Sequence, residues 1–118
     1  MILDTTTLKL EAVLDAAVAA NQPEVNVYYV TWNVQGVQTR PSTFRVALNS
    51  NTDVTILAAP TTQNEVREVI GATIYNKDTG SVVVTVKTDD GTTERIIVKA
   101  TLGAGRTLEF NRNYGWRW

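Results

Sequence analysis

The feature that most restricts the fold of this chain is its content of β-branched residues. Valine (16 residues) and threonine (18 residues) together occupy 34 of the 118 positions. A side chain branched at Cβ loses rotamer freedom in a helix and fits the pleated surface of a sheet, so these residues favour strands. The sequence therefore predicts an all-β protein.

Alternation of residues between two faces is clearest in the second half of the chain. In Ser81–Thr88 the even-numbered valines share one face, as in a strand with one buried side. Val66–Tyr75 precedes this segment and Thr92–Leu102 follows it, and clusters of turn-forming residues at Asn76–Gly80 and Asp89–Gly91 separate the three. The pattern predicts two successive hairpins, which together make a three-stranded meander. Two further short strands are expected at 107–110 and 114–118.

The first half of the chain is less regular. Val25–Trp32 reads as a strand with aromatic residues on both faces, and Phe44–Leu48 with Val54–Leu57 reads as a hairpin around a polar turn. Leu8–Ala20 fits both an amphipathic helix and a strand. We favour a strand over Leu8–Leu14 that runs into an alanine-rich bend, because the other elements are all short strands.

These segments amount to eight or nine short strands with turn signals about every 8 to 12 residues, which is typical of sandwiches. We therefore expect an antiparallel β-sandwich or jelly roll of about eight strands. Residues 8–118 are expected to form a single β-sandwich domain, and Met1–Thr7, rich in threonine, is expected to be a flexible N-terminal arm.

The composition excludes several classes of function. The chain has no cysteine and no histidine, which rules out thiolate nucleophiles, Cys/His zinc sites and histidine general bases. A net charge of −1 argues against binding to nucleic acid through many phosphates. No segment approaches the roughly 20 apolar residues that span a bilayer, and the first residues lack the pattern of a secretory signal. We expect a soluble product made in a cytoplasm that acts on neither nucleic acid nor membrane.

The acidic residues offer no convincing catalytic or metal site. Asp89 and Asp90 could ligate a cation, but they precede Gly91 and are more typical of a turn. Two pairs of glutamates could act as acid and base, Glu65 with Glu68 and Glu94 with Glu109. Nothing in their spacing requires it, because charged residues on strands usually face solvent. We expect no enzyme activity, no catalytic residue, no cofactor and no metal ligand.

Aromatic residues are the best candidates for an interaction surface, because they are enriched in the centres of protein interfaces. Six stand out: Tyr28, Tyr29, Trp32, Tyr114, Trp116 and Trp118. Each of them could equally pack in the core of its own domain. The last three lie among arginines near the C-terminus, a pattern that could stack nucleic-acid bases but is more often a final strand.

Several short motifs carry a resemblance to a known group of proteins. They are Asn21-Gln22-Pro23, Ala58-Ala59-Pro60, Val66–Ile70, Ile74–Thr79, Ser81–Val86, Lys99–Leu102, Gly105–Phe110 and Gly115-Trp116-Arg117. With these motifs, spread over most of the chain, the sequence resembles small structural proteins of tailed bacteriophages. All of them are strand and turn signals, so no catalytic residue is carried over from that group.

The resemblance implies a β-sandwich component of the virion. The first expectation is a capsid decoration (cement) protein on the capsid surface, a homotrimer that bridges subunits of the major capsid protein. A tail, neck or fibre-associated adaptor is the second reading. A carbohydrate-binding β-sandwich module that uses exposed aromatic residues is a third, from another class of function.

Overall fold

Ten β-strands make up the regular structure of the chain, and no helix forms. The computed structural model describes every residue from Met1 to Trp118. The strands are β1 (Ile2–Leu3), β2 (Lys9–Leu14), β3 (Glu24–Trp32), β4 (Ser42–Ala47), β5 (Val54–Leu57), β6 (Val66–Tyr75), β7 (Val82–Asp89), β8 (Glu94–Leu102), β9 (Thr107–Asn111) and β10 (Gly115–Arg117). The prediction of an all-β protein is confirmed.

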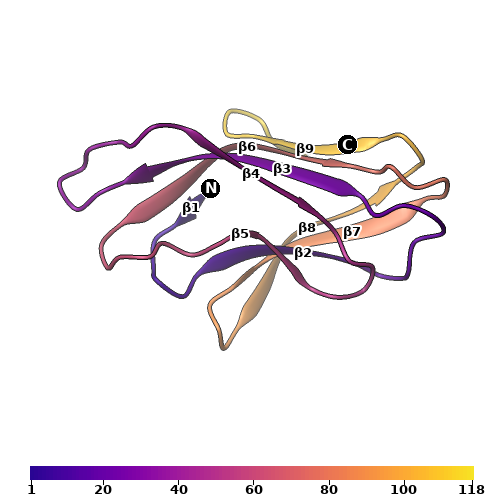
Figure 1. Cartoon of the computed structure of the whole chain (residues 1–118), viewed down its shortest axis with the longest axis horizontal. Helices are drawn as coiled ribbons and strands as arrows, with labels where there is room; N and C mark the ends of the chain where they lie inside the picture. Colours follow the sequence, from indigo (N-terminus) through magenta and orange to yellow (C-terminus); the bar gives the residue numbers. More distant parts are fainter.

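The strands form two antiparallel sheets that lie one above the other (Figure 1). The larger sheet has the order β10-β9-β6-β3-β4, with β1 also paired to β6. The smaller sheet has the order β5-β2-β7-β8. The two layers agree with the predicted β-sandwich, in which the inner faces of both sheets supply the core.

The core fills the space between the sheets with aliphatic side chains. The three even-numbered valines of β7 are buried, as the alternation predicts, and they face this core. Its largest fully buried side chains are Leu3, Leu10, Leu14, Leu48, Ile56, Leu57, Ile74, Leu102, Leu108, Val25 and Val27, whereas Val30 is equally buried but lies outside this cluster. Burying a side chain of this size contributes about 1.5–3 kcal/mol, so a chain without disulfides can hold this fold.

The predicted hairpin of Val66–Tyr75 with Ser81–Thr88 is wrong, and so is the meander built on it. β6 belongs to the larger sheet and β7 to the smaller one, so the chain crosses between the sheets over residues 76–81. The next pair, β7 and β8, does form the expected hairpin, with Val84 opposite Ala100. The chain then crosses back to β9. A cluster of turn formers reverses the chain equally well within a sheet and between sheets, and local sequence does not separate the two.

Two side chains hold the crossover between β6 and β7. Asn76 is fully buried, and its Nδ2 lies 2.9–3.0 Å from the carbonyl oxygens of Gly80, Leu102 and Gly103, so its two N–H groups are shared among three acceptors. Its Oδ1 accepts the backbone N–H of Asp78 at 3.0 Å. The Asn76 side chain therefore joins this crossover to the one between β8 and β9.

The carboxylate of Asp78 organises a distant segment of the chain. It accepts three backbone N–H bonds, from Ala19 at 2.9 Å, Ala20 at 2.8 Å and Asn21 at 3.0 Å. These bonds, chiefly those from Ala19 and Asn21, lower the pKa of Asp78 to about 2. The alanine-rich bend after β2 is thus fastened to the crossover.

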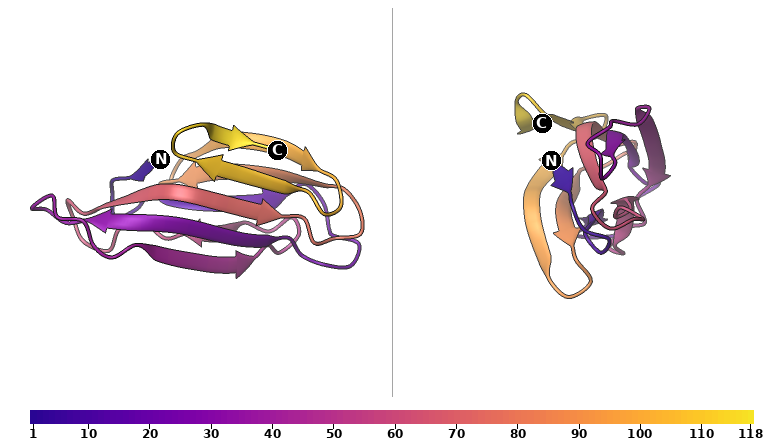
Figure 2. Two further views of the ribbon diagram at one scale, coloured as in Figure 1. Left: turned by 90° about the horizontal axis from the view of Figure 1, so that it is seen from above. Right: turned by 90° about the vertical axis from the view of Figure 1, so that its left-hand side faces the viewer.

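The predicted hairpin of Phe44–Leu48 with Val54–Leu57 is also wrong. β4 pairs with β3 in the larger sheet, with Val27 opposite Phe44, whereas β5 pairs with β2 in the smaller sheet. The polar turn between them again carries the chain from one layer to the other. The hairpin that forms instead joins β3 to β4 through a longer loop, and Figure 2 shows this loop projecting at one end of the molecule.

The N-terminal segment differs in part from the expectation of a free arm. Leu8–Leu14 contains strand β2, so the strand interpretation of this segment is confirmed over the helical one. Residues 1–3, however, are not free. Ile2 and Leu3 pair with Glu68 and Arg67 of β6, and Leu3 is completely buried in the core. Met1 also packs against the core, and its carbonyl oxygen accepts the backbone N–H of Val69 at 2.8 Å, so the whole short segment is docked on β6.

Candidate functional site

The six aromatic residues predicted as interface candidates divide between the core and the surface. Tyr29 packs against the core, and the guanidinium of Arg67 lies 5.5 Å from the centre of its ring. Trp116 also packs against the core, with its ring centre 5.1 Å from that of Phe110. Tyr29 and Trp116 are therefore structural residues of the domain.

Three of the other candidates are exposed. Tyr28 is 45% exposed, Tyr114 is 77% exposed and Trp118 is 59% exposed. Tyr114 lies in the turn between β9 and β10, where the guanidinium of Arg117 is 5.9 Å from its ring centre. Packing in the core of the domain therefore does not apply to these three side chains, and their role as interface residues stays a prediction.

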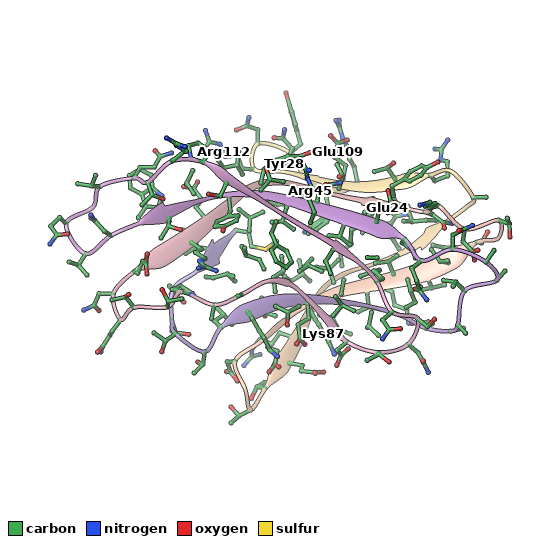
Figure 3. The ribbon with its side chains drawn as sticks, in the orientation of Figure 1. Glu24, Tyr28, Arg45, Lys87, Glu109 and Arg112 are labelled. Atoms are coloured by element: carbon green, nitrogen blue, oxygen red, sulfur yellow. The ribbon has the colours of Figure 1, made fainter.

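Tyr28 and the half-buried Trp32 lie on the outer face of the larger sheet, two alternations apart on β3. Tyr28 is opposite Gly71 of β6, and a Cβ built at Gly71 would lie 3.6 Å from the Tyr28 ring. This is an ordinary van der Waals distance, so the Tyr28 ring lies over β6 at Gly71. Figure 3 shows Tyr28 on the same side of the larger sheet as Arg112.

Trp32 is linked to charged residues of neighbouring strands. Its Nε1 donates a hydrogen bond to Glu68 Oε2 at 3.0 Å, and the other oxygen of Glu68 lies 3.5 Å from Arg112 Nη1. Tyr28, Trp32, Glu68 and Arg112 therefore make a mixed aromatic and charged surface, which we call the outer aromatic face.

The loop between β3 and β4 extends this hairpin beyond the sheet. We call residues Asn33–Gln38 the β3–β4 tip. Val34 is 57% exposed and Val37 is 58% exposed, and none of the six residues is charged. The tip projects at one end of the long axis of the molecule in both views that show this axis (Figures 1 and 2).

The β3–β4 tip is ordered by its own hydrogen bonds. Asn33 Oδ1 accepts the backbone N–H groups of Gln35 at 3.0 Å and Val37 at 2.9 Å. The backbone N–H of Asn33 donates to the carbonyl of Val37, and Gly36 takes a positive φ of 74° that suits glycine. The two valines are therefore held outward by a turn that the free protein already contains.

The acidic residues considered as catalytic or metal sites lie apart or form turns. Glu94 lies on β8 and Glu109 on β9, in opposite sheets. Asp89 Oδ1 accepts the N–H of Gly91, and Asp90 Oδ1 accepts the N–H groups of Thr92 and Thr93. These backbone bonds lower the pKa of both aspartates. The interpretation of Asp89-Asp90 as turn formers is confirmed.

A buried ionic cluster on the outer face of the smaller sheet has no counterpart in the sequence analysis. Glu11 of β2 and Lys87 of β7 stand opposite each other, only 4% and 7% exposed. Lys87 Nζ lies 2.9 Å from Asp53 Oδ1 and 2.9 Å from Glu94 Oε2. Burial lowers the pKa of Lys87, but its bonds to these two carboxylates outweigh that effect, so its pKa is raised. Figure 3 places Lys87 on the opposite side of the molecule from Tyr28 and Arg112.

A scan against protein-family models and searches of curated proteins and of solved structures give no match to this chain. No helix in the structure has the length and apolar character needed to cross a membrane.

Proposed function

We propose that this protein is a structural component of a bacteriophage virion, a capsid decoration (cement) protein that binds the major capsid protein on the capsid surface as a homotrimer. Two findings support this proposal. The sequence resembles small phage structural proteins, and the chain has the β-sandwich fold that the resemblance implies. A decoration protein stabilises a shell by binding only its assembled state. Such a protein needs a well-formed surface that contacts the capsid subunits, and it needs no catalytic site.

The β3–β4 tip is the observation that carries the proposal. It presents Val34 and Val37 outward on an uncharged turn that is ordered before any partner binds. Preordering lowers the entropy that binding costs, and uncharged apolar groups lose little on desolvation. The same hairpin exposes Tyr28 and Phe44, so four of the ten exposed large hydrophobic residues lie on it. We assign the capsid contact to this hairpin.

The first experiment counts the copies of this chain in purified virions against the major capsid protein, by quantitative mass spectrometry. A decoration protein follows the repeated symmetry of the shell and gives a count on the order of hundreds. About a dozen copies or fewer would move the protein to the tail, the neck or a fibre adaptor. Complete absence from the virion would contradict the whole proposal.

The contact is tested with heads of the same phage from which this chain has been stripped. The double variant Val34→Asp, Val37→Asp places two charges in the proposed contact and should weaken rebinding by at least about tenfold, since each buried unpaired charge costs more than 1.4 kcal/mol. Ala104→Asp in the exposed turn between β8 and β9 is the matched control and should bind normally. Equal binding by all three proteins would remove the tip from the contact.

The trimer is tested separately by light scattering on the purified chain and on protein released from heads. A trimer in either sample supports the symmetric arrangement, because closed cyclic symmetry repeats each contact without leaving an unused surface. A monomer in both samples would contradict it.

The outer aromatic face favours one alternative, a carbohydrate-binding module. Aromatic rings on a sheet face next to hydrogen-bonding groups can stack sugars, and Trp32 is held here by Glu68. Glycan-array binding that Trp32→Ala and Tyr28→Ala both abolish would support this function. Trp116 cannot serve in this test, because its ring packs on Phe110 and its loss would disturb the core.

A further inference from the structure

The ionic cluster on the smaller sheet contains more carboxylate groups than ammonium groups. Lys87 and Lys9 supply two ammonium groups. Four carboxylates surround them, namely those of Glu11, Asp53, Asp89 and Glu94. The group therefore carries two uncompensated negative charges, and part of it is buried, where such charge is costly. A divalent cation would neutralise it.

The cluster also holds carboxylate oxygens without a protein partner. Glu11 Oε1 lies 2.6 Å from Lys9 Nζ, but Glu11 Oε2 is buried and has no hydrogen-bond partner. Lys87 contacts only Oδ1 of Asp53 and only Oε2 of Glu94. A buried carboxylate oxygen normally finds a donor or a cation, so Glu11 Oε2 is the independent sign of a missing ligand.

The geometry of these oxygens suits calcium. One oxygen each of Glu11, Asp53 and Glu94 lies within 4.8 Å of the other two. Ca²⁺ binds oxygen at about 2.3–2.6 Å, so two ligands of one ion can be up to about 5 Å apart. Three oxygens at that upper limit lie about 2.8 Å from a common centre, so a small movement of the exposed Asp53 and Glu94 side chains brings all three onto one ion. Water can complete the coordination.

We propose that Glu11, Asp53 and Glu94 bind a Ca²⁺ ion beside the ammonium group of Lys87. The ligands come from β2, from the loop before β5 and from β8, and Lys87 comes from β7. The ion thus joins β2, β8 and the loop before β5. Because the site exists only in the folded chain, Ca²⁺ stabilises the fold, and this stabilisation rises with the logarithm of the Ca²⁺ concentration once that exceeds the dissociation constant. The proposal does not depend on the capsid function.

The test uses the full chain freed of metal with a chelator, then titrated with CaCl₂ by calorimetry and unfolded by heat with and without CaCl₂. We expect one saturable site per chain and a higher midpoint of unfolding in Ca²⁺. A dissociation constant on the order of 10⁻⁴ to 10⁻³ M, as in extracellular calcium-binding modules, is sufficient to support the proposal. Absence of saturable binding up to 10 mM CaCl₂, about tenfold above that range, would overturn the proposal.

Two variants locate the ion. Glu94→Gln removes one ligand charge at a side chain that is 51% exposed, so the fold is not at risk, and it should weaken binding at least about tenfold. Asp15→Asn makes the same change in charge at the exposed Asp15–Lys99 pair and should bind Ca²⁺ as the unchanged protein does. Equal weakening by both variants, or by neither, would show that calcium does not bind at this cluster.

Discussion

Replacing Asn76 by alanine tests how the two sheets are held together. The Asn76 side chain contacts four backbone groups within hydrogen-bond distance, and two of these contacts are fully buried: Nδ2 to the carbonyl of Leu102, and the N–H of Asp78 to Oδ1. Alanine would leave both of these backbone groups without a partner. The other two bonds, to Gly80 and Gly103, are partly buried, so water can replace the lost donor there.

A buried polar group left without a partner costs about 1–3 kcal/mol, so Asn76→Ala should lower the free energy of unfolding by about 2–6 kcal/mol. A domain of 118 residues has about 6–18 kcal/mol in total, so the loss is large and measurable. Urea unfolding followed by tryptophan fluorescence and circular dichroism measures it. Asn113→Ala, at an exposed turn, is the control and should change stability by less than about 0.5 kcal/mol.

A second variant separates hydrogen bonding from the loss of side-chain volume. Asn76→Asp keeps the acceptor for the N–H of Asp78 but turns a carboxylate oxygen toward three carbonyl oxygens. It should be at least as unstable as Asn76→Ala near neutral pH. The reasoning is refuted if the alanine variant loses less than about 1 kcal/mol, or if the aspartate variant is as stable as the unchanged protein.

Three further perturbations follow from the fold. The pKa of Asp78 is about 2 in the folded protein against an ordinary value of 3.8, so its charge stabilises the fold above about pH 4 and this stabilisation is lost as the pH falls toward 2. The free energy of unfolding, measured in urea between pH 2 and 5, should therefore depend less on pH in Asp78→Asn than in the unchanged protein. Leu3→Ala should cost about 2–5 kcal/mol, because this side chain is completely buried, whereas exposed Ile2→Ala should be nearly neutral in the same assay. Trp116→Ala should lower the thermal midpoint, because it removes the ring that packs on Phe110, and an unchanged midpoint would show that the contact contributes nothing.

Strand positions could be predicted from the sequence, but the pairing of strands could not. β6 begins and ends at the predicted residues, and β7 is shifted by a single residue, because alternation is a local property. Which sheet each strand enters depends on contacts between distant segments. The clearest case is Asn76–Gly80, where the sequence predicts only a turn between two paired strands. The side chains of Asn76 and Asp78 instead fasten the crossover to β8 and to the bend after β2.

For the candidate sites too, the sequence predicts local features but does not predict which distant residues come together. Six aromatic residues could be named from their type, but which of them face solvent depends on the register of β3, β9 and β10. The β3–β4 tip was missed because isolated valines in a loop give no signal. The cluster around Lys87 was missed because Glu11, Asp53 and Lys87 meet only after β2 pairs with both β5 and β7. Their opposite charges on outward-facing positions were the only available hint.

The pairing of β2 with β7 also governs when the molecule can fold. In this ladder Lys9 stands opposite Asp89. Strand β2 therefore cannot pair with β7 until about eighty more residues have been synthesised. Contacts between such distant segments slow folding, to milliseconds or seconds in all-β domains of this size. The larger sheet also needs β9 and β10 from the end of the chain. The smaller sheet is complete only when β8 has been made, and the larger sheet only when β9 and β10 have been made, so this domain cannot form both layers before its last strands are available.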